Sequence, residues 1–417
     1  MIGIFTNSDF WERLSAIFSA LWSFWAVWLP LLLGIVFYEI WMRYSRILYV
    51  SKLDPILIEI KIPKEILKSP AAMEVFFTAL YQPFSGTYTS VFFKGATRVW
   101  FSFEIVSVGG DVKFYIWLPR GWKNYVESQL YSQYPNVELY EREDYTMNFH
   151  FDPEANDING GQLTLTKPDP YPIKTYIDYG LDKDPKEEFK IDPMTPLIEY
   201  LGSLKPEEQA WIQIMIQAHK EEKALEGRIF KKKEMWKKEA QGEIKKIIRE
   251  SIFTPDKNPV TGEKPMSFMG ISPAEKDVIQ AIERSISKRA FDTMIRVIYA
   301  APKGIFFVGG APSLISTFGH FGSQTLNGFK KSWGPTYDYS WQDFKKRRST
   351  MHKKQLLSAY KQRYFFNAPF KNFHGKPFIL TTEELATIFH FPGEVSKTPT
   401  FERILSKKSE APANLPI

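Results

Sequence analysis

The chain alternates between two hydrophobic periodicities after residue 54. Apolar residues occupy every second position in 58–62, recur at helical spacing in 73–80, and alternate again on both sides of Gly109-Gly110. A period of two is typical of half-buried strands, and a period near 3.6 is typical of amphipathic helices. With a helix at 122–130 and a last strand near 138, the order predicts a ferredoxin-like (split-βαβ) domain over 55–150.

A second α+β domain is predicted over 160–393. Its expected elements are strands at 173–177, 212–216 and 294–299, a helix at 196–204, and helices that open with capping boxes at Ser272 and Thr381. The order resembles a decayed repeat of the first domain, with a charged helical insertion at 220–250 and a loop at 251–271. Residues 394–417 have no apolar period, so we expect a linker-like tail.

The N-terminal region contains the longest uncharged run. Residues 14–38 include 25 consecutive positions without Asp, Glu, Lys, Arg or His. At about 1.5 Å per residue, such a helix crosses a hydrocarbon core of roughly 30 Å. The pattern predicts one transmembrane helix over 14–42, preceded by an extracytoplasmic N-terminus at 1–13. A buried core helix and a cleaved signal peptide are the alternatives.

The charges beside this span predict its orientation. Arg43, Arg46 and Lys52 follow the span, whereas Arg13 precedes it close to two acidic residues. Because positive residues favour the cytoplasmic side, we expect a single-pass protein of the inner (cytoplasmic) membrane, with the bulk of the chain in the cytoplasm.

The amino-acid composition and the motifs limit the kinds of catalytic and metal-binding sites that the chain can form. The 417 residues include no cysteine, which excludes thiol nucleophiles and cysteine-ligated metal centres. The motifs GxxxxGK[ST], GxGxxG, GxSxG and HExxH are absent, and the six histidines show no metal-binding spacing. Gly262-Glu263-Lys264-Pro265 lacks the first glycine and the Ser/Thr of a phosphate loop, and Gly309-Gly310 is either a tight connection or an anion-binding helix start. We therefore predict no catalytic residue, cofactor or metal, and expect His390 to interact with the carbonyls that end its helix.

One segment carries the excess positive charge. The net charge is +7, and 345–363 alone contains eight basic residues without an acid, so the rest of the chain is close to neutral. These residues are Lys345, Lys346, Arg347, Arg348, Lys353, Lys354, Lys361 and Arg363. Aromatic residues at 360 and 364–366 accompany them, so the segment 345–366 is a candidate contact for nucleic acid or for anionic lipid. A solvated helix face is the simpler interpretation.

Several stretches resemble one family. LIEIKIPKEILKSPAAMEVFFTALYQ (57–82), FSFEIVSVGGDVKFYIWLPR (101–120), ESQLYSQYPNVELYE (127–141), DPMTPLIEYLGSLKPEEQAWIQIMIQ (192–217) and the stretch 381–417 are similar to the non-catalytic N-terminal region of type IV secretion or conjugative-transfer coupling-protein-like (HerA/FtsK-type) ATPases. The resemblance implies a membrane-anchored accessory region of a DNA-translocating machine. The chain departs from the family pattern because it contains no Walker A motif, so no nucleotide-binding residue is carried over.

Three hypotheses follow. The first is a non-catalytic, membrane-anchored scaffold of a type IV secretion or conjugative DNA-transfer machine, which docks a separately encoded P-loop motor ATPase or another secretion protein. The second is a membrane-tethered nucleic-acid-binding protein, with DNA held by the segment 345–366. The third is an enzyme whose site forms only in the folded chain. Homo-oligomerisation is compatible with each of them.

Overall fold

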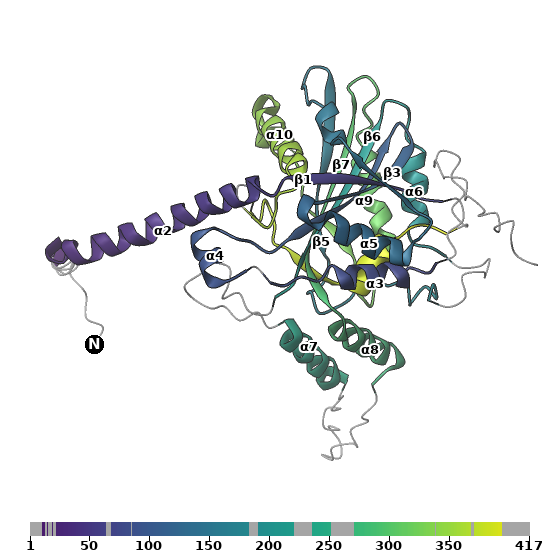
Figure 1. Cartoon of the computed structure of the whole chain (residues 1–417), viewed down its shortest axis with the longest axis horizontal. Coiled ribbons are helices and arrows are strands. Elements are labelled where there is room, and N and C mark those ends of the chain that lie inside the picture. Colours follow the sequence, from purple (N-terminus) through teal and green to yellow (C-terminus); the bar gives the residue numbers. More distant parts are fainter. Residues whose placement is uncertain are drawn as a thin grey trace, which may run out of the picture.

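A computed structural model describes residues 11–393, apart from 13–14, 16–18, 20–21, 64–67, 85, 183–190, 221–235, 252–270, 338 and 368–370. One large antiparallel sheet has helices on both faces, and one long helix projects away from it (Figure 1). The predicted α+β class is confirmed. The predicted N-terminus at 1–13, the first part of the predicted span, Gly262–Pro265 and the tail at 394–417 lie wholly or mostly outside the described residues.

The helices are α2 (Trp25–Ser51), α3 (Ala71–Ala79), α4 (Tyr88–Phe93), α5 (Lys123–Gln133), α6 (Thr195–Gly202), α7 (Trp236–Ser251), α8 (Pro273–Ser287), α9 (Gly310–Thr317), α10 (Arg347–Lys361) and α11 (Thr382–Ile388). The strands are β1 (Pro55–Lys61), β2 (Trp100–Val108), β3 (Asp111–Pro119), β4 (Glu138–Arg142), β5 (Asn156–Leu165), β6 (Gln209–Ala218), β7 (Ala290–Pro302), β8 (Phe329–Trp333) and β9 (Phe378–Thr381).

The sheet has nine strands in the order β4-β1-β3-β2-β6-β7-β5-β8, with β9 paired to β7, and every pairing is antiparallel. The predicted strands in 55–142 are present, and a short additional helix, α4, precedes β2. Gly109 and Gly110 turn the β2-β3 hairpin with φ values of 62° and 87°, which glycine adopts without strain. Strands β2 and β6 pair along their whole length, so one sheet continues through both predicted domains.

The expected strand at 173–177 is wrong. Residues from Ile173 to Ile177 form no strand, because their backbone amides pair with α11 side chains, with the Phe321 carbonyl and with Asp178. Ile173 N donates to the Glu384 carboxylate at 2.9 Å, and Tyr176 N donates to Thr387 Oγ1 at 2.9 Å. The strand in this region is β5, which precedes the predicted position. The predicted capping boxes at Ser272 and Thr381 are confirmed.

One face of the sheet is covered by α3, α5, α6, α9 and α11. The apolar side chains that face these helices form the main core, including Ile58, Phe103, Phe114, Ile214 and Val297. Each of the five helices contributes buried residues to the same cluster. This face is the one that the period-two pattern predicts, since alternate side chains along a strand point to the same side.

The opposite face is also buried, beneath α10 and the last turn of α2. Trp100, Trp117, Trp211 and Ile298 of the sheet pack there against Leu356, Leu357 and Tyr360 of α10 and Val50 of α2. The same face carries a row of polar residues at directly paired positions across six strands, which we call the polar row: Glu59, Tyr115, Glu104, Gln213, Arg296 and Gln162. The strands are therefore buried on both sides, whereas their alternation predicts burial on one.

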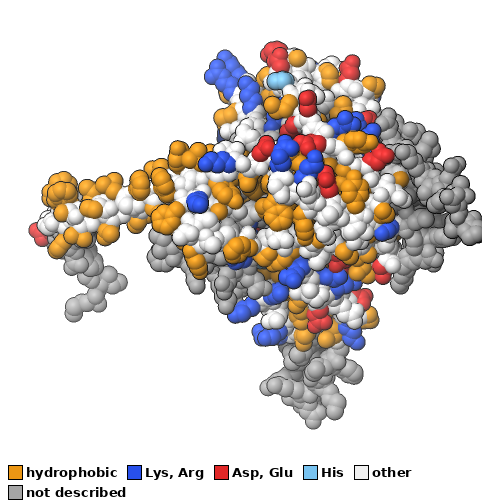
Figure 2. All heavy atoms as spheres, in the orientation of Figure 1, with side chains coloured by type: hydrophobic (Ala, Val, Ile, Leu, Met, Phe, Trp, Pro, Cys, Tyr) orange, Lys and Arg blue, Asp and Glu red, His pale blue; other side chains and the backbone are white. Residues whose placement is uncertain are grey.

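Helix α2 is long and apolar enough to cross a membrane. Its most apolar window of 18 residues is only 6% buried, so almost all of its hydrophobic surface points away from the protein (Figures 1 and 2). The helix continues to Ser51, beyond the predicted end at residue 42, and its last turn packs into the core through Val50. Only three residues separate α2 from β1.

Candidate functional site

Helix α10 separates the eight basic residues into a buried part and an exposed part. Its C-terminal half lies on the polar row, because Leu356, Leu357 and Tyr360 supply an apolar stripe that packs onto the sheet tryptophans. Its N-terminal end extends beyond the sheet and carries the blue patch at the top of Figure 2. The basic segment is thus partly a core element and partly a surface.

Arg363 belongs to the core and is withdrawn from any contact surface. The side chain is 1% exposed and forms a two-point ion pair with fully buried Glu104, with Nε–Oε1 and Nη2–Oε2 distances of 3.0 Å each. It also pairs with Asp144. Burial alone would raise the pKa of Asp144, but the Arg363 guanidinium holds that pKa below its usual range. A bidentate arginine–carboxylate pair of this kind is a structural clamp.

Gln213 and Arg296 of the polar row complete this clamp, together with Ser102 and Tyr145. Glu104 accepts further hydrogen bonds from Ser102 at 2.7 Å, Tyr145 at 2.8 Å and Gln213 at 3.2 Å. Arg296 donates to Gln213 at 2.9 Å and to the Ala359 carbonyl at 2.8 Å, and burial lowers its pKa to about 9. These bonds fix α10 across the junction between β2, β6 and β7.

Two of the lysines are also engaged with the fold. Lys353 pairs with Asp157 of β5. Lys361 donates to the Phe149 carbonyl at 2.7 Å, and burial lowers its pKa. Neither side chain is fully exposed, and both hold α10 against neighbouring segments.

The remaining residues form an exposed group that we call the basic cap: Lys345, Lys346, Arg347, Arg348 and Lys354. Its backbone is unusual for such residues, because Lys345 and Lys346 adopt left-handed φ values of 56° and 55° immediately before α10. Asp343 accepts hydrogen bonds from Arg348 N at 2.8 Å and Ser349 N at 3.0 Å, which starts the helix.

The basic cap opposes the electrostatics of its own helix. Cations at a helix N-terminus interact unfavourably with the macrodipole, and left-handed backbone in non-glycine residues costs of order 1–3 kcal/mol each. Arg348 donates to the Gln342 carbonyl at 3.0 Å and lies over the Tyr337 ring, whereas the side chains of Lys345, Lys346 and Arg347 are exposed. Strain of this kind is typical of positions kept for binding.

Three exposed aromatic residues lie next to the basic cap in sequence. Tyr339, Trp341 and Phe344 are 61%, 74% and 80% exposed, and the rings of Tyr339 and Trp341 stack at 6.0 Å. Of the aromatic residues at 360 and 364–366 that are expected from the sequence to accompany the basic residues, Tyr360 and Phe365 are buried. The sequence signal for these three exposed residues is an aromatic run that precedes the basic run and has no helical period.

Other titratable groups have structural partners. His390 Nδ1 lies 2.9 Å from the Ala386 carbonyl, so its predicted interaction with the end of its helix is confirmed, and Nε2 lies 3.2 Å from Asp192. His219 pairs with Asp292 at 2.6 Å beside Arg98. Across the part of the chain that the structure describes, no three His, Asp or Glu side chains are grouped as a metal site. Gly309-Gly310 is the start of α9, and the Gly310 backbone packs closely against the Tyr299 ring.

Comparison with protein-family models gives one match, which covers residues 54–403. The matched family is described as a domain of unknown function, DUF8128. The chain belongs to the DUF8128 family. The DUF8128 match begins one residue before β1 and includes the whole sheet and α10, but it excludes α2. Curated proteins show no match to the chain. The family assignment thus places the sheet, the polar row and the basic cap within one domain.

Proposed function

We propose that the protein is a membrane-anchored, non-catalytic scaffold of a type IV secretion or conjugative DNA-transfer machine, which docks a separately encoded P-loop ATPase. The proposal of a membrane anchor rests on the exposure of α2. A core helix of this composition would be mostly buried, whereas the apolar window of α2 is 6% buried. The machine and its ATPase are proposed from the sequence resemblance.

The junction between α2 and the domain supports an anchor that is retained. The helix runs without a break from its apolar part into residues of the core, where Met42, Ser45 and Val50 are buried. Removal of α2 as a signal peptide would strip these residues from the fold. Exposed Arg43 and half-buried Arg46 follow the apolar part, which supports a cytoplasmic domain in the inner membrane.

We also infer that the DUF8128 sheet consists of two ferredoxin-like units joined edge to edge. The first unit has the strand order β4-β1-β3-β2, and the second has β8-β5-β7-β6. In both orders the first strand of the unit lies between the fourth and the third, as in a split-βαβ fold. Helices α3 and α5 serve the first unit and α6 and α9 the second, while α7 and α8 interrupt the second.

The end of the sheet remote from α2 is the proposed docking face. Because β1 and β3 are antiparallel and Pro55 lies opposite Pro119, the β2-β3 hairpin lies at the end away from the anchor. The Gly109 backbone there packs on Pro206, and a neighbouring groove of about 520 Å³ is lined by Tyr200, Leu204 and Phe306, among others. Phe307 and Val308 beside it are 58% and 74% exposed.

The test is co-purification of the full chain from detergent extracts, with bound proteins identified by mass spectrometry. The proposal predicts recovery of a P-loop ATPase and its loss when Phe307 and Val308 are both changed to Asp. The matched control is Val75→Asp, at an apolar position that is 53% exposed on α3. Recovery of no ATPase or secretion protein would overturn the docking role, and equal loss with the control would overturn the choice of face.

The basic cap supports a second candidate function, nucleic-acid binding. Its exposed cations with adjacent exposed aromatic rings match the chemistry of single-stranded DNA, which combines phosphates with stackable bases. Alanine at positions 345–348 is expected to reduce the slope of log affinity against log salt by up to about 4, since each lost phosphate contact removes about 1.

A charge-matched control is available on α7. Alanine at the exposed residues Lys237, Lys238, Lys245 and Lys246 removes the same four charges from another surface. The cap hypothesis predicts that this variant keeps the wild-type slope. Undetectable or salt-insensitive binding by the wild-type chain, or equal effects of the two variants, would remove nucleic-acid binding at the cap.

A further inference from the structure

A short aromatic helix, α4, is held against the exposed part of α2. Gly95, which follows α4, has a φ of 69°, and a Cβ there would lie 2.5 Å from the Ser45 carbonyl carbon of α2. The two backbones are therefore in direct contact, and Val91 of α4 is fully buried beside this contact. The position of α4 relative to α2 is consequently fixed by packing at Gly95.

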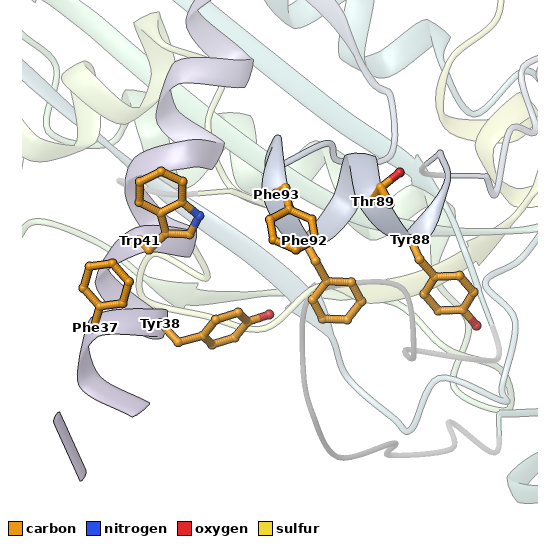
Figure 3. Close-up of a pocket in the computed structure, with 7 residues that line it drawn as sticks. All are labelled: Phe37, Tyr38, Trp41, Tyr88, Thr89, Phe92 and Phe93. Carbon is orange, nitrogen blue, oxygen red and sulfur yellow. The ribbon is translucent and has the colours of Figure 1, made fainter. Parts of the chain in front are cut away.

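The surface formed by the two helices is apolar but open. A groove of about 540 Å³ lies between Phe37, Tyr38 and Trp41 of α2 and Tyr88, Thr89, Phe92 and Phe93 of α4 (Figure 3). Tyr38 of α2 extends across this groove toward Phe92 of α4, whereas Tyr88 points away from α2. Phe84, Tyr88 and Phe93 are 67%, 64% and 70% exposed, so α4 presents aromatic rings to the surroundings in the same region as α2.

Helix α4 lies beside the part of α2 at which a spanning helix would leave the membrane. The uncharged run of the chain ends at Tyr38, so Phe37 to Trp41 lie where a spanning helix leaves the hydrocarbon and enters the headgroup region. Aromatic side chains are enriched at this depth because an apolar ring with a polar edge suits the interface. Exposed Arg43 on α2 and exposed Lys94 at the end of α4 follow directly, where anionic headgroups would meet them.

We propose that α4 with Phe84 and Phe93 inserts into the cytoplasmic-leaflet interface beside α2, so that the domain has a second, monotopic contact with anionic lipid. The proposal rests on the proposed membrane span of α2. Lipid is the occupant because the apolar surface of α4 is continuous with that of α2. Exposed Arg43 and Lys94 border this surface, beside one exposed acid, Glu39. A helix crossing the membrane alone leaves the domain free to tilt, whereas a second contact at the same depth fixes its orientation.

The absence of cysteine permits a direct test in the full chain. Four variants each carry a single cysteine, in place of Phe84, Phe93, Phe37 or Phe344, and each cysteine is labelled with a nitroxide. Each labelled variant is reconstituted in nanodiscs of phosphatidylcholine with or without phosphatidylglycerol. Power-saturation electron paramagnetic resonance then compares collisions with oxygen, which concentrates in lipid, and with a water-soluble nickel chelate. Phe37 reports on α2 itself, and Phe344, which is 80% exposed on the basic cap side, is the matched aqueous control.

The expected result is high oxygen and low nickel accessibility at positions 84 and 93 as at 37, with the reverse at 344. Phosphatidylglycerol is expected to increase this difference at 84 and 93. If positions 84 and 93 are accessible to nickel while position 37 is exposed to lipid, the inference about α4 is overturned and the proposed membrane span of α2 stands. If position 37 is accessible to nickel, the inference about α4 and the proposed membrane span are both overturned. Low accessibility to both reagents at 84 and 93 would also overturn the inference, because the labels would then be packed against the protein itself and not against lipid. Equal depth in both lipid mixtures would overturn the role of anionic headgroups.

Discussion

Replacement of Arg363 by methionine tests whether this residue is a structural clamp. The change keeps a long apolar stem but removes the guanidinium from fully buried Glu104. Glu104 then loses two hydrogen bonds of 3.0 Å and its countercharge, and retains three donors, on Ser102, Tyr145 and Gln213. Breaking a buried ion pair from one side typically costs 3–5 kcal/mol, so we expect the free energy of unfolding to fall by about 4 kcal/mol.

The double variant E104Q/R363M isolates the electrostatic part of this loss. With both charges removed, no uncompensated ion stays in the core, and we expect the double variant to recover about 2 kcal/mol relative to R363M alone. Asp144 is partly exposed, with a side chain that is 29% accessible, so it can turn to water in either variant.

The measurement is urea denaturation of the full chain in detergent micelles, followed by tryptophan fluorescence. Trp100 is a built-in reporter, because its Nε1 donates to the Arg363 carbonyl at 3.0 Å in the buried face. Lys354→Met on the exposed side of α10 is the control and should leave the denaturation midpoint unchanged. An R363M variant as stable as the wild type, or a double variant no more stable than R363M, would refute the clamp.

Three further predictions concern other parts of the sheet and its helices. Burial raises the pKa of Glu384 from 4.5 to about 7, so the folded protein is stabilised by the protonated carboxyl and loses this stability as pH rises. Thermal denaturation should show the free energy of unfolding falling between pH 5 and 8 by up to about 3 kcal/mol. The variant E384Q should flatten that pH dependence. Gly160→Ala places a Cβ 2.1 Å from the Val297 carbonyl oxygen, so β5 must separate from β7. Calorimetry should show a lower melting temperature for this variant. Gly121→Ala is the control and should keep the wild-type melting temperature, because its Cβ meets open space. Leu356→Ala empties a fully buried position of α10 and should cost about 2–5 kcal/mol, with faster proteolysis of the loop before α10 as a second readout.

The polar row shows why part of the fold could be predicted from the sequence and part could not. The alternation in β2 and β3 correctly gave both strands and the face that meets the helices. The same alternation assigned Ser102 and Glu104 to a solvated face, because polar residues at every second position normally face water. Glu104 is buried by Arg363, which is 259 residues away in the chain. A charge and its partner at that separation leave no local signal in the sequence.

Other differences have equally specific causes. Strand β5 was missed because Gly160 and Gly161 interrupt its apolar alternation, although close approach to β7 and β8 requires glycine at both positions. The segment from Ile173 to Ile177 alternates like a strand, but its backbone partners include α11 side chains and the Phe321 carbonyl, and none of the strands that the structure describes. The basic segment was identified correctly as the main concentration of charge, while its division into clamp and cap depends on which side of α10 meets the sheet.

The short connection between α2 and β1 has a mechanical consequence. Residues 52–54 link the helix directly to a strand that lies in the interior of its half of the sheet, between β4 and β3. Backbone hydrogen bonds of antiparallel strands run perpendicular to the strands, so tension along α2 loads the bonds on both sides of β1 in shear and all at once. An edge strand pulled in the same direction would be held by hydrogen bonds on one side only. The sheet is therefore built to resist a pull exerted through its own N-terminal helix.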